Sequence, residues 1–204
     1  MKNFIQKGFT LAEVLITLAI LGVVAAVTLP NMVQDQKYQQ LGVQLAKFTS
    51  TLENAATAYA VGLGGSFGDN SDVLDFAQNT FILKSGSVTT VSSSSYGCNG
   101  SNACELKDGT SISFKGATQA DGIYNADVNV VGTGAFIVLF KPDTKLANSL
   151  PGVKQFAFVV TTKGYVFPLN KENNVISTCT KALYDAQYRV KPSDYTTGSC
   201  KSAS

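Results

Sequence analysis

Histidine and tryptophan are both absent from this chain of 204 residues. Without histidine, the chain lacks the side chain that most often acts as a general base and that most often supplies nitrogen to zinc. Its cysteines also lack the C-x-x-C spacing typical of zinc sites. Neither a Walker-type phosphate-binding loop nor a paired-carboxylate motif occurs. We therefore predict that the protein is not an enzyme.

Charged residues are also scarce, at 15% of the sequence, and they almost balance. The 16 basic residues exceed the 14 acidic residues by a formal net charge of +2, and Lys2 and Lys7 account for the excess. The rest of the chain is therefore neutral and lacks the basic patch on which nucleic-acid binding depends. We expect no nucleic-acid partner.

The chain does contain a long apolar run near its start. Residues 9–29 are apolar or small, with one carboxylate, Glu13, near the beginning. At about 1.5 Å per residue, a helix of this length spans about 30 Å, the thickness of the hydrocarbon core of a bilayer. A carboxylate inside a membrane span costs about 2.5–3.5 kcal/mol, so Glu13 needs a partner or a purpose.

Two ordinary explanations of this run are a secretory signal peptide and a plain single-span anchor. A signal peptide would be cleaved after a small-residue site such as Val24-Ala25-Ala26. The run is longer than the apolar core of most signal peptides, however, and an acidic residue weakens such a signal. A plain anchor would explain the length and leave Glu13 unexplained.

The residues around Gly8, Phe9 and Glu13, within the stretch KGFTLAEVLITLAILG, resemble the processing site of type IV pilins and the related pseudopilins. The resemblance extends over residues 1 to about 60. It implies that a prepilin peptidase removes leader residues 1–8 by cutting between Gly8 and Phe9, and that the new amino group of Phe9 is methylated. It also implies that Glu13 pairs with the terminal amine of a neighbouring subunit and so sets the register.

The resemblance further implies a structural subunit of a type IV pilus or related filament. Its expected partners are copies of itself, other pilins, the peptidase and an inner-membrane assembly platform. Before assembly the chain would cross the inner membrane once, with a cytoplasmic N-terminus, as Lys2 and Lys7 also indicate, and a periplasmic or extracellular head. A minor pilin, a pseudopilin of type II secretion, and a competence or adhesive pilin remain as alternatives.

The helical pattern continues beyond the apolar run in amphipathic form over residues 30–61. Its apolar stripe recurs at steps of three and four, the spacing of one helix face: Leu41, Leu45, Phe48, Leu52, Ala55 or Ala56, and Tyr59. We expect this stripe to pack against the protein's own sheet rather than a partner helix. Gly22 and Pro30 predict a kink or local unwinding within the helix. Gly62, Gly64 and Gly65 predict its end.

The pattern of the remaining chain predicts a small head that contains an antiparallel sheet. The whole chain is therefore expected to adopt an α+β fold, in which a long N-terminal helix packs on this sheet. We expect a loop region at 62–109, with a short helix over 72–79 capped by Ser71. The sheet is expected within 110–178, followed by a tail at 179–204. The strand-like segments are 110–115, 126–131, 135–141, 154–162 and 165–168, with a hairpin turn at 162–164.

Residues 85–95 form a tract of Gly, Ser, Thr and Val that ends in four serines. A solvated loop is the simplest interpretation of such a tract. O-glycosylation and a contact between subunits are the alternatives.

The chain contains four cysteines: Cys98, Cys104, Cys179 and Cys200. An even number of cysteines in a translocated domain predicts two disulfides, and four cysteines can pair in three ways. Nearest-neighbour pairing is favoured, because five turn-forming residues separate the first two cysteines. Many type IV pilins close a C-terminal loop with a disulfide, and by resemblance Cys179 and Cys200 occupy the matching place.

One weak metal candidate lies in the segment from Asp121 to Asp127. Asp121, Asn125 and Asp127 supply oxygen atoms at alternating spacing, as in a calcium loop. The segment lacks the later glutamate of an EF-hand and its glycine is displaced, so an ordinary turn between strands is the alternative to calcium binding. No other cofactor is expected.

Overall fold

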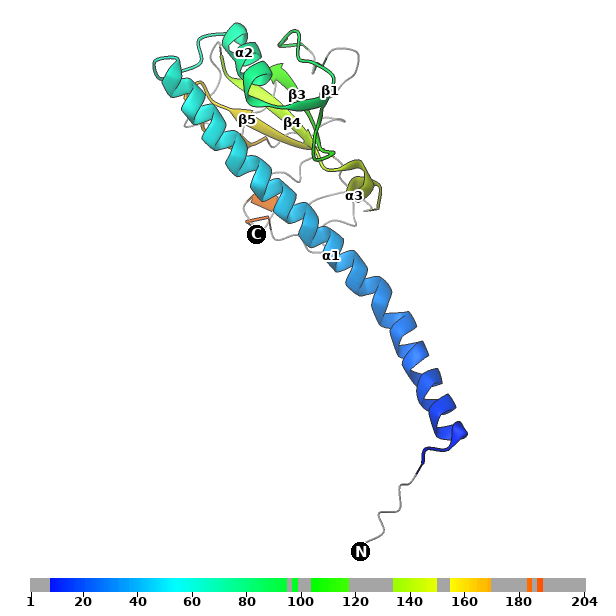
Figure 1. The fold of residues 1–204 in the computed structure, drawn as a ribbon. Coiled ribbons are helices and arrows are strands. Elements are labelled where there is room, and N and C mark those ends of the chain that lie inside the picture. The colour runs from blue at the N-terminus through cyan, green and yellow to red at the C-terminus, as the bar shows by residue number, and fades with distance from the viewer. Residues whose placement is uncertain are drawn as a thin grey trace, which may run out of the picture. The chain divides into compact units, whose positions relative to one another are not determined.

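The computed structural model describes residues 8–94, 97–98, 104–117, 134–149, 155–169, 183–184 and 187–188. Two compact units divide the chain, residues 1–36 and residues 37–204. The regular structure of the described residues consists of a long helix, two short helices and a six-stranded antiparallel sheet (Figure 1). The predicted α+β class is confirmed.

Helix α1 comprises Leu11–Gly62 and ends where the glycines predicted its end. Gly64 adopts a φ of +90°, in the left-handed region. The Gly65 N–H donates to the Ala60 carbonyl at 2.8 Å, and the Gly64 N–H donates to the Val61 carbonyl at 3.1 Å. These two bonds form a Schellman motif, which satisfies carbonyls that the last turn would otherwise leave unpaired.

The sequence predicted a kink or local unwinding between Gly22 and Pro30. The unwinding is not observed, because α1 is helical through both residues, and the kink stays a prediction. Proline removes one donor from the helix and strains the turn before it. The other backbone hydrogen bonds of the apolar segment remain. In an apolar medium, each backbone N–H or C=O group left unpaired costs several kcal/mol of free energy. A continuous helix therefore retains more bonds than a broken one.

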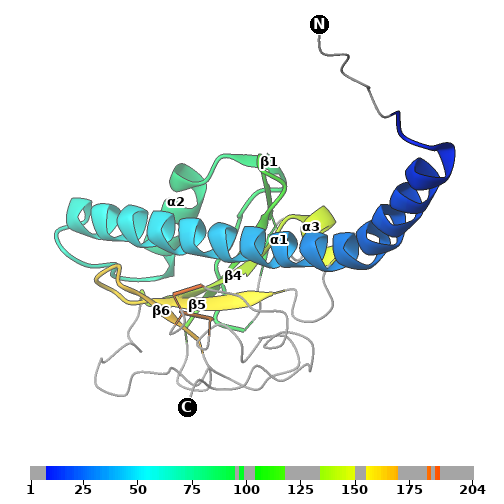
Figure 2. The same cartoon turned by 90° about the horizontal axis from the view of Figure 1, so that it is seen from below.

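The apolar stripe of α1 packs on one face of the sheet (Figure 2). Leu41, Leu45 and Leu52 are almost completely buried. The ring of Phe48 stacks on that of Phe140, with centroids 4.2 Å apart. The stripe is thus confirmed as the core face of the head rather than a free surface for a partner helix.

The sheet is a simple meander in which each strand pairs with the next, in the order β1-β2-β3-β4-β5-β6. Four of the predicted strands are confirmed: 110–115 is shifted by one residue, and 135–141, 154–162 and 165–168 are shorter than expected. The predicted strand 126–131 lies outside the described residues. The strands are β1 (Leu83–Ser85), β2 (Cys104–Leu106), β3 (Ser111–Gly116), β4 (Phe136–Lys141), β5 (Phe156–Val160) and β6 (Val166–Pro168).

Strands β4 and β5 are buried on both faces. Val138 and Phe158 belong to the core cluster that contains the α1 stripe, whereas Ile137 and Val159 belong to a separate cluster. Burial on both faces explains why these strands are continuous apolar runs without polar alternation.

Three features of the head differ from the sequence-based expectation. The segment 62–109 is not only loop, because it contains α2 (Asn70–Thr80), β1 and β2. The cap of α2 is Asp69 rather than Ser71: its Oδ1 accepts hydrogen bonds from the N–H groups of Ser71 at 2.7 Å and Asp72 at 3.4 Å. A short helix, α3 (Thr144–Ser149), also follows β4 where only a connection was expected.

Tyr188 joins a segment near the C-terminus to α1. The Thr49 hydroxyl donates to the Leu45 carbonyl at 2.8 Å, and it lies 2.6 Å from the Tyr188 hydroxyl. Since a threonine hydroxyl has one proton, Tyr188 is the donor in the second bond. Burial raises the pKa of Tyr188 from 10.0 to about 12, and the nearby Glu53 acts in the same direction.

We therefore expect alkaline destabilisation of the head that depends on Tyr188. A raised folded-state pKa gives a stabilising contribution that is complete below pH 10 and is lost as the pH rises through about 12. Thermal unfolding of the full chain in detergent should show a melting temperature that falls over this interval. The fall should be shallower in Tyr188→Phe, which cannot ionise. Tyr165→Phe, at a tyrosine whose side chain is 51% exposed, is the control and should keep the original slope. Equal slopes in all three proteins would contradict the assignment.

Candidate processing and assembly site

The predicted cleavage residues lie just before α1. Gly8, Phe9 and Thr10 have no helical or strand structure, and the Phe9 side chain is 88% exposed. A Cβ added to Gly8 would meet no atom within 4 Å. The peptide bond between Gly8 and Phe9 is therefore outside the helix and accessible, as a protease requires. Leader residues 1–7 lie outside the described residues.

Thr10 and Glu13 form a capping box at the start of α1. Glu13 Oε2 accepts hydrogen bonds from the Thr10 N–H at 3.0 Å and from the Thr10 hydroxyl at 2.9 Å. In return, the Glu13 N–H donates to Thr10 Oγ1 at 3.3 Å. Thr10 is the N-cap and Glu13 the third helical residue, the positions that this motif requires.

The capping box gives the Glu13 carboxylate partners within its own chain. A negative charge in the first turn of a helix is also favoured by the helix dipole. The carboxylate is thus hydrogen-bonded before any second subunit is present, which lowers the cost of placing it beside an apolar segment. Thr10 was missed in the sequence analysis, although the pattern T-x-x-E ahead of an apolar run is a known sign of this motif.

The first part of α1, up to Leu29, presents apolar side chains on every side. Of the described helices, α1 alone is long and apolar enough to cross a membrane. Large side chains along it, including Leu15, Leu21 and Val27, are more than half exposed. The hydroxyls of Thr17 and Thr28 donate to the carbonyls of Val14 and Val24, each at 3.0 Å. The polar atoms of these threonines are therefore satisfied within the helix, leaving an apolar surface to be covered.

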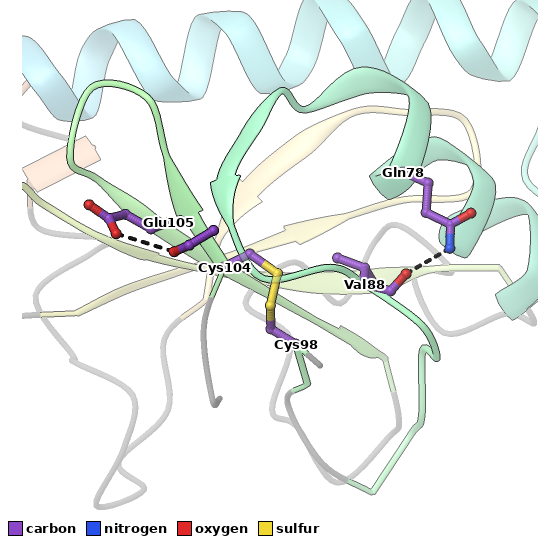
Figure 3. The surroundings of a disulfide bond; sticks show 6 residues. Gln78, Val88, Cys98, Cys104 and Glu105 are labelled. Carbon is purple, nitrogen blue, oxygen red and sulfur yellow. Dashed lines mark hydrogen bonds between the residues drawn. A yellow bond between two sulfur atoms is a disulfide. The ribbon is translucent and has the colours of Figure 1, made fainter. Parts of the chain in front are cut away.

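The first predicted disulfide is present in the head. Cys98 and Cys104 are bonded, with Cα atoms 5.5 Å apart (Figure 3). Gly86 lies against this bond, because a Cβ there would approach Cys98 Sγ to 2.6 Å. Cys179 and Cys200 lie outside the described residues, so their pairing remains a prediction.

Calcium binding in the segment from Asp121 to Asp127 stays a prediction. Asp121, Asn125 and Asp127 lie outside the described residues. Within the residues that are described, no group of three or more Asp, Glu, Cys or His side chains is placed to hold a metal ion.

A G-x-S-x-G match at residues 64–68 does not build a serine nucleophile site. In hydrolases that use this motif, the serine sits on a sharp turn between a strand and a helix, and a histidine activates it. Here Ser66 follows the end of α1, and the chain has no histidine.

Residues 4–29 match the family model for the prokaryotic N-terminal methylation motif. This motif is the signature of type IV pilins and pseudopilins, and it contains Gly8, Phe9, Thr10 and Glu13. Comparison with curated proteins and with solved structures gives no match.

Proposed function

We propose that this chain is a structural subunit of a type IV pilus or a related filament. The observation that carries the proposal is the methylation motif at residues 4–29, which spans an accessible cleavage bond, the Thr10–Glu13 box and the exposed apolar first part of α1. Each part corresponds to a step of assembly: processing, charge pairing and helix packing.

The apolar surface of α1 supports both states of such a subunit. In the membrane, lipid tails surround the helix at no hydrophobic cost. Outside the membrane the same apolar surface must be buried away from water, and the helices of other copies bury it. Burial of apolar area away from water contributes about 25 cal/mol per Å², which is enough to hold a filament together when tens of side chains take part.

The cleavage proposed here places a new amine one residue before the capping box. An ammonium group stabilises a carboxylate in an apolar environment, and each group is costly there without the other. We propose that Glu13 pairs with the terminal amine of a neighbouring copy. Subunits in the wrong register would leave both charges unpaired.

Intact-mass measurement of the purified chain tests the processing step. We expect a mature protein that lacks residues 1–8 and carries one methyl group on Phe9. Gly8→Val should retain the leader, because a branched side chain beside the scissile bond obstructs the peptidase. Gly22→Val is the matched control, since Gly22 also has open space around it, and it should be processed normally.

Two outcomes of this measurement would contradict the proposal. A mature chain beginning after Ala26 would indicate a secretory signal peptide, and an uncleaved chain would indicate a plain anchor. If processing occurs as expected, the location of the mature chain separates the remaining alternatives. Abundant recovery from sheared surface filaments supports a pilus subunit, whereas retention with the membranes supports a pseudopilin.

A further inference from the structure

A second Schellman motif occurs near the C-terminus, and its residue types are unusual. The Tyr188 N–H donates to the Leu183 carbonyl at 2.7 Å, and the Gln187 N–H donates to the Tyr184 carbonyl at 2.9 Å. Gln187 and Tyr188 have φ angles of +52° and +58°, in the left-handed region. They are the only described residues other than glycine with a positive φ. We call Leu183, Tyr184, Gln187 and Tyr188 the strap.

The same motif at the end of α1 shows what is unusual about the strap. There Gly64 and Gly65 occupy the two corresponding positions, with φ angles of +90° and +113°. Glycine adopts this conformation without a steric penalty, whereas any other residue brings its Cβ too close to the following carbonyl oxygen. Glutamine and tyrosine both carry that penalty. The backbone of the strap is therefore strained, and other contacts must hold it in place.

Side chains attach the strap, which is orange in Figure 1, to the core of the head beside α1. Leu183 is 4% exposed and belongs to the core cluster that contains the α1 stripe. The Tyr188 ring packs against the same cluster, and its hydroxyl donates to Thr49 Oγ1 at 2.6 Å. The Tyr184 ring meets the Tyr188 ring edge-on, with centroids 6.1 Å apart. These side-chain contacts compensate for the strained backbone.

Backbone hydrogen bonds, in contrast, do not join the strap to another element within the part of the chain that the structure describes. Both backbone bonds of the strap are internal to it. Strand β4 is different, because it pairs with β3 along one edge and with β5 along the other. A segment without such backbone pairing opens at a lower free energy than the core strands. The strap can therefore detach without breaking the sheet.

We propose that the strap is a conformational switch that opens and closes over α1 while the sheet stays folded. Strain at Gln187 and Tyr188 favours the open form. The burial of Leu183 and the hydrogen bond from Tyr188 to Thr49 favour the closed form. Opening uncovers Thr49, which is 6% exposed in the closed form. The inference is independent of the proposed filament function, since every residue it uses lies in the compact unit of residues 37–204.

Hydrogen exchange of the full chain in detergent, measured by mass spectrometry, tests the proposal. After correction for intrinsic rates, we expect wild-type peptides that contain Gln187 and Tyr188 to exchange about tenfold faster, or more, than peptides of β4 and β5. The exchange rate of the strap should also stay constant at low denaturant concentration, because a local opening exposes little surface. The exchange rates of the two strands should rise, because they exchange through unfolding of the head.

Variants at two positions separate the opposing contributions. Gln187→Gly relieves the left-handed strain and should slow exchange of the strap about fivefold. Gln187→Ala is the matched control, because it shortens the side chain but keeps the Cβ, and it should exchange like the wild type. Tyr188→Phe removes the hydrogen bond to Thr49 and should speed exchange of the strap about fivefold. Tyr165→Phe, at an exposed tyrosine outside the strap, should leave this rate unchanged.

Two results would overturn the proposal. If the strap and the strands of the wild type were equally protected and responded equally to denaturant, the strap would open only when the whole head unfolds. If Gln187→Gly and Gln187→Ala exchanged at the same rate, strain would not drive the opening. The wild-type measurement decides the first point even if a variant fails to fold. It also gives the same answer whether or not the chain forms filaments, because it is made on the dispersed protein.

Discussion

Replacing Glu13 by alanine is expected to abolish filament assembly while leaving cleavage at Gly8 and membrane insertion intact. This expectation rests on the proposed pairing of Glu13 with a neighbour's amine. Without the carboxylate, each terminal ammonium would be buried without a partner, at a cost of about 3–5 kcal/mol per subunit. This cost recurs at every subunit and falls on the contact that sets the register, so a correctly placed subunit loses its advantage over a misplaced one. The measurement is recovery of the chain in filaments sheared from cells, compared with recovery in membranes.

The capping box provides a second role for Glu13, and two further variants separate the roles. Glu13→Gln retains a side chain that can accept the Thr10 N–H bond but carries no charge. Thr10→Val keeps the charge and removes the hydroxyl, which should weaken the helix start by about 1 kcal/mol. We expect Glu13→Gln to fail in assembly and Thr10→Val to reduce assembly without abolishing it. Normal filaments from Glu13→Gln would show that the cap, not the charge, is what assembly requires.

Sequence patterns predicted those elements whose structure depends on residues close together in the chain. The apolar run and the stripe from Leu41 to Tyr59 have the period of a helix, and glycines mark its end. Strands β4 and β5 were predictable because both their faces are buried and their residues are apolar. The first two strands were not, since three residues such as Leu83–Ser85 are too short to show alternation.

Contacts between distant segments could not be predicted from patterns. Asp69 and Ser71 are both good N-cap residues, and the path of the chain into α2 decides which one occupies that position. Thr49 and Tyr188 are 139 positions apart, and no local sequence pattern at either residue predicts their hydrogen bond. The hairpin at Thr162 to Gly164 was predicted as a turn, but its contact with α1 depends on the complete fold.

That contact leads us to expect a large loss of stability in Gly164→Ala. Gly164 has a φ of +86°, and a Cβ there would lie 2.6 Å from the Thr57 nitrogen and from the Ala56 carbonyl carbon of α1. The left-handed conformation costs a non-glycine residue about 1–3 kcal/mol, and the overlap with helix backbone adds about 1–3 kcal/mol. We expect a free energy of unfolding lower by about 3 kcal/mol and a melting temperature lower by about 10 °C. Thermal unfolding of the full chain in detergent measures both.

Two other glycines separate the causes of this loss. Gly64 has a φ of +90° and open space around it, so Gly64→Ala should show the conformational cost alone, about 1 kcal/mol. Gly62 is helical, with open space and no positive φ, so Gly62→Ala should be neutral or slightly stabilising. If Gly164→Ala lost no more stability than Gly64→Ala, the close approach of the hairpin to α1 would not contribute. A clearly larger loss means that the β5–β6 turn requires glycine because the helix backbone occupies the space that any side chain would need.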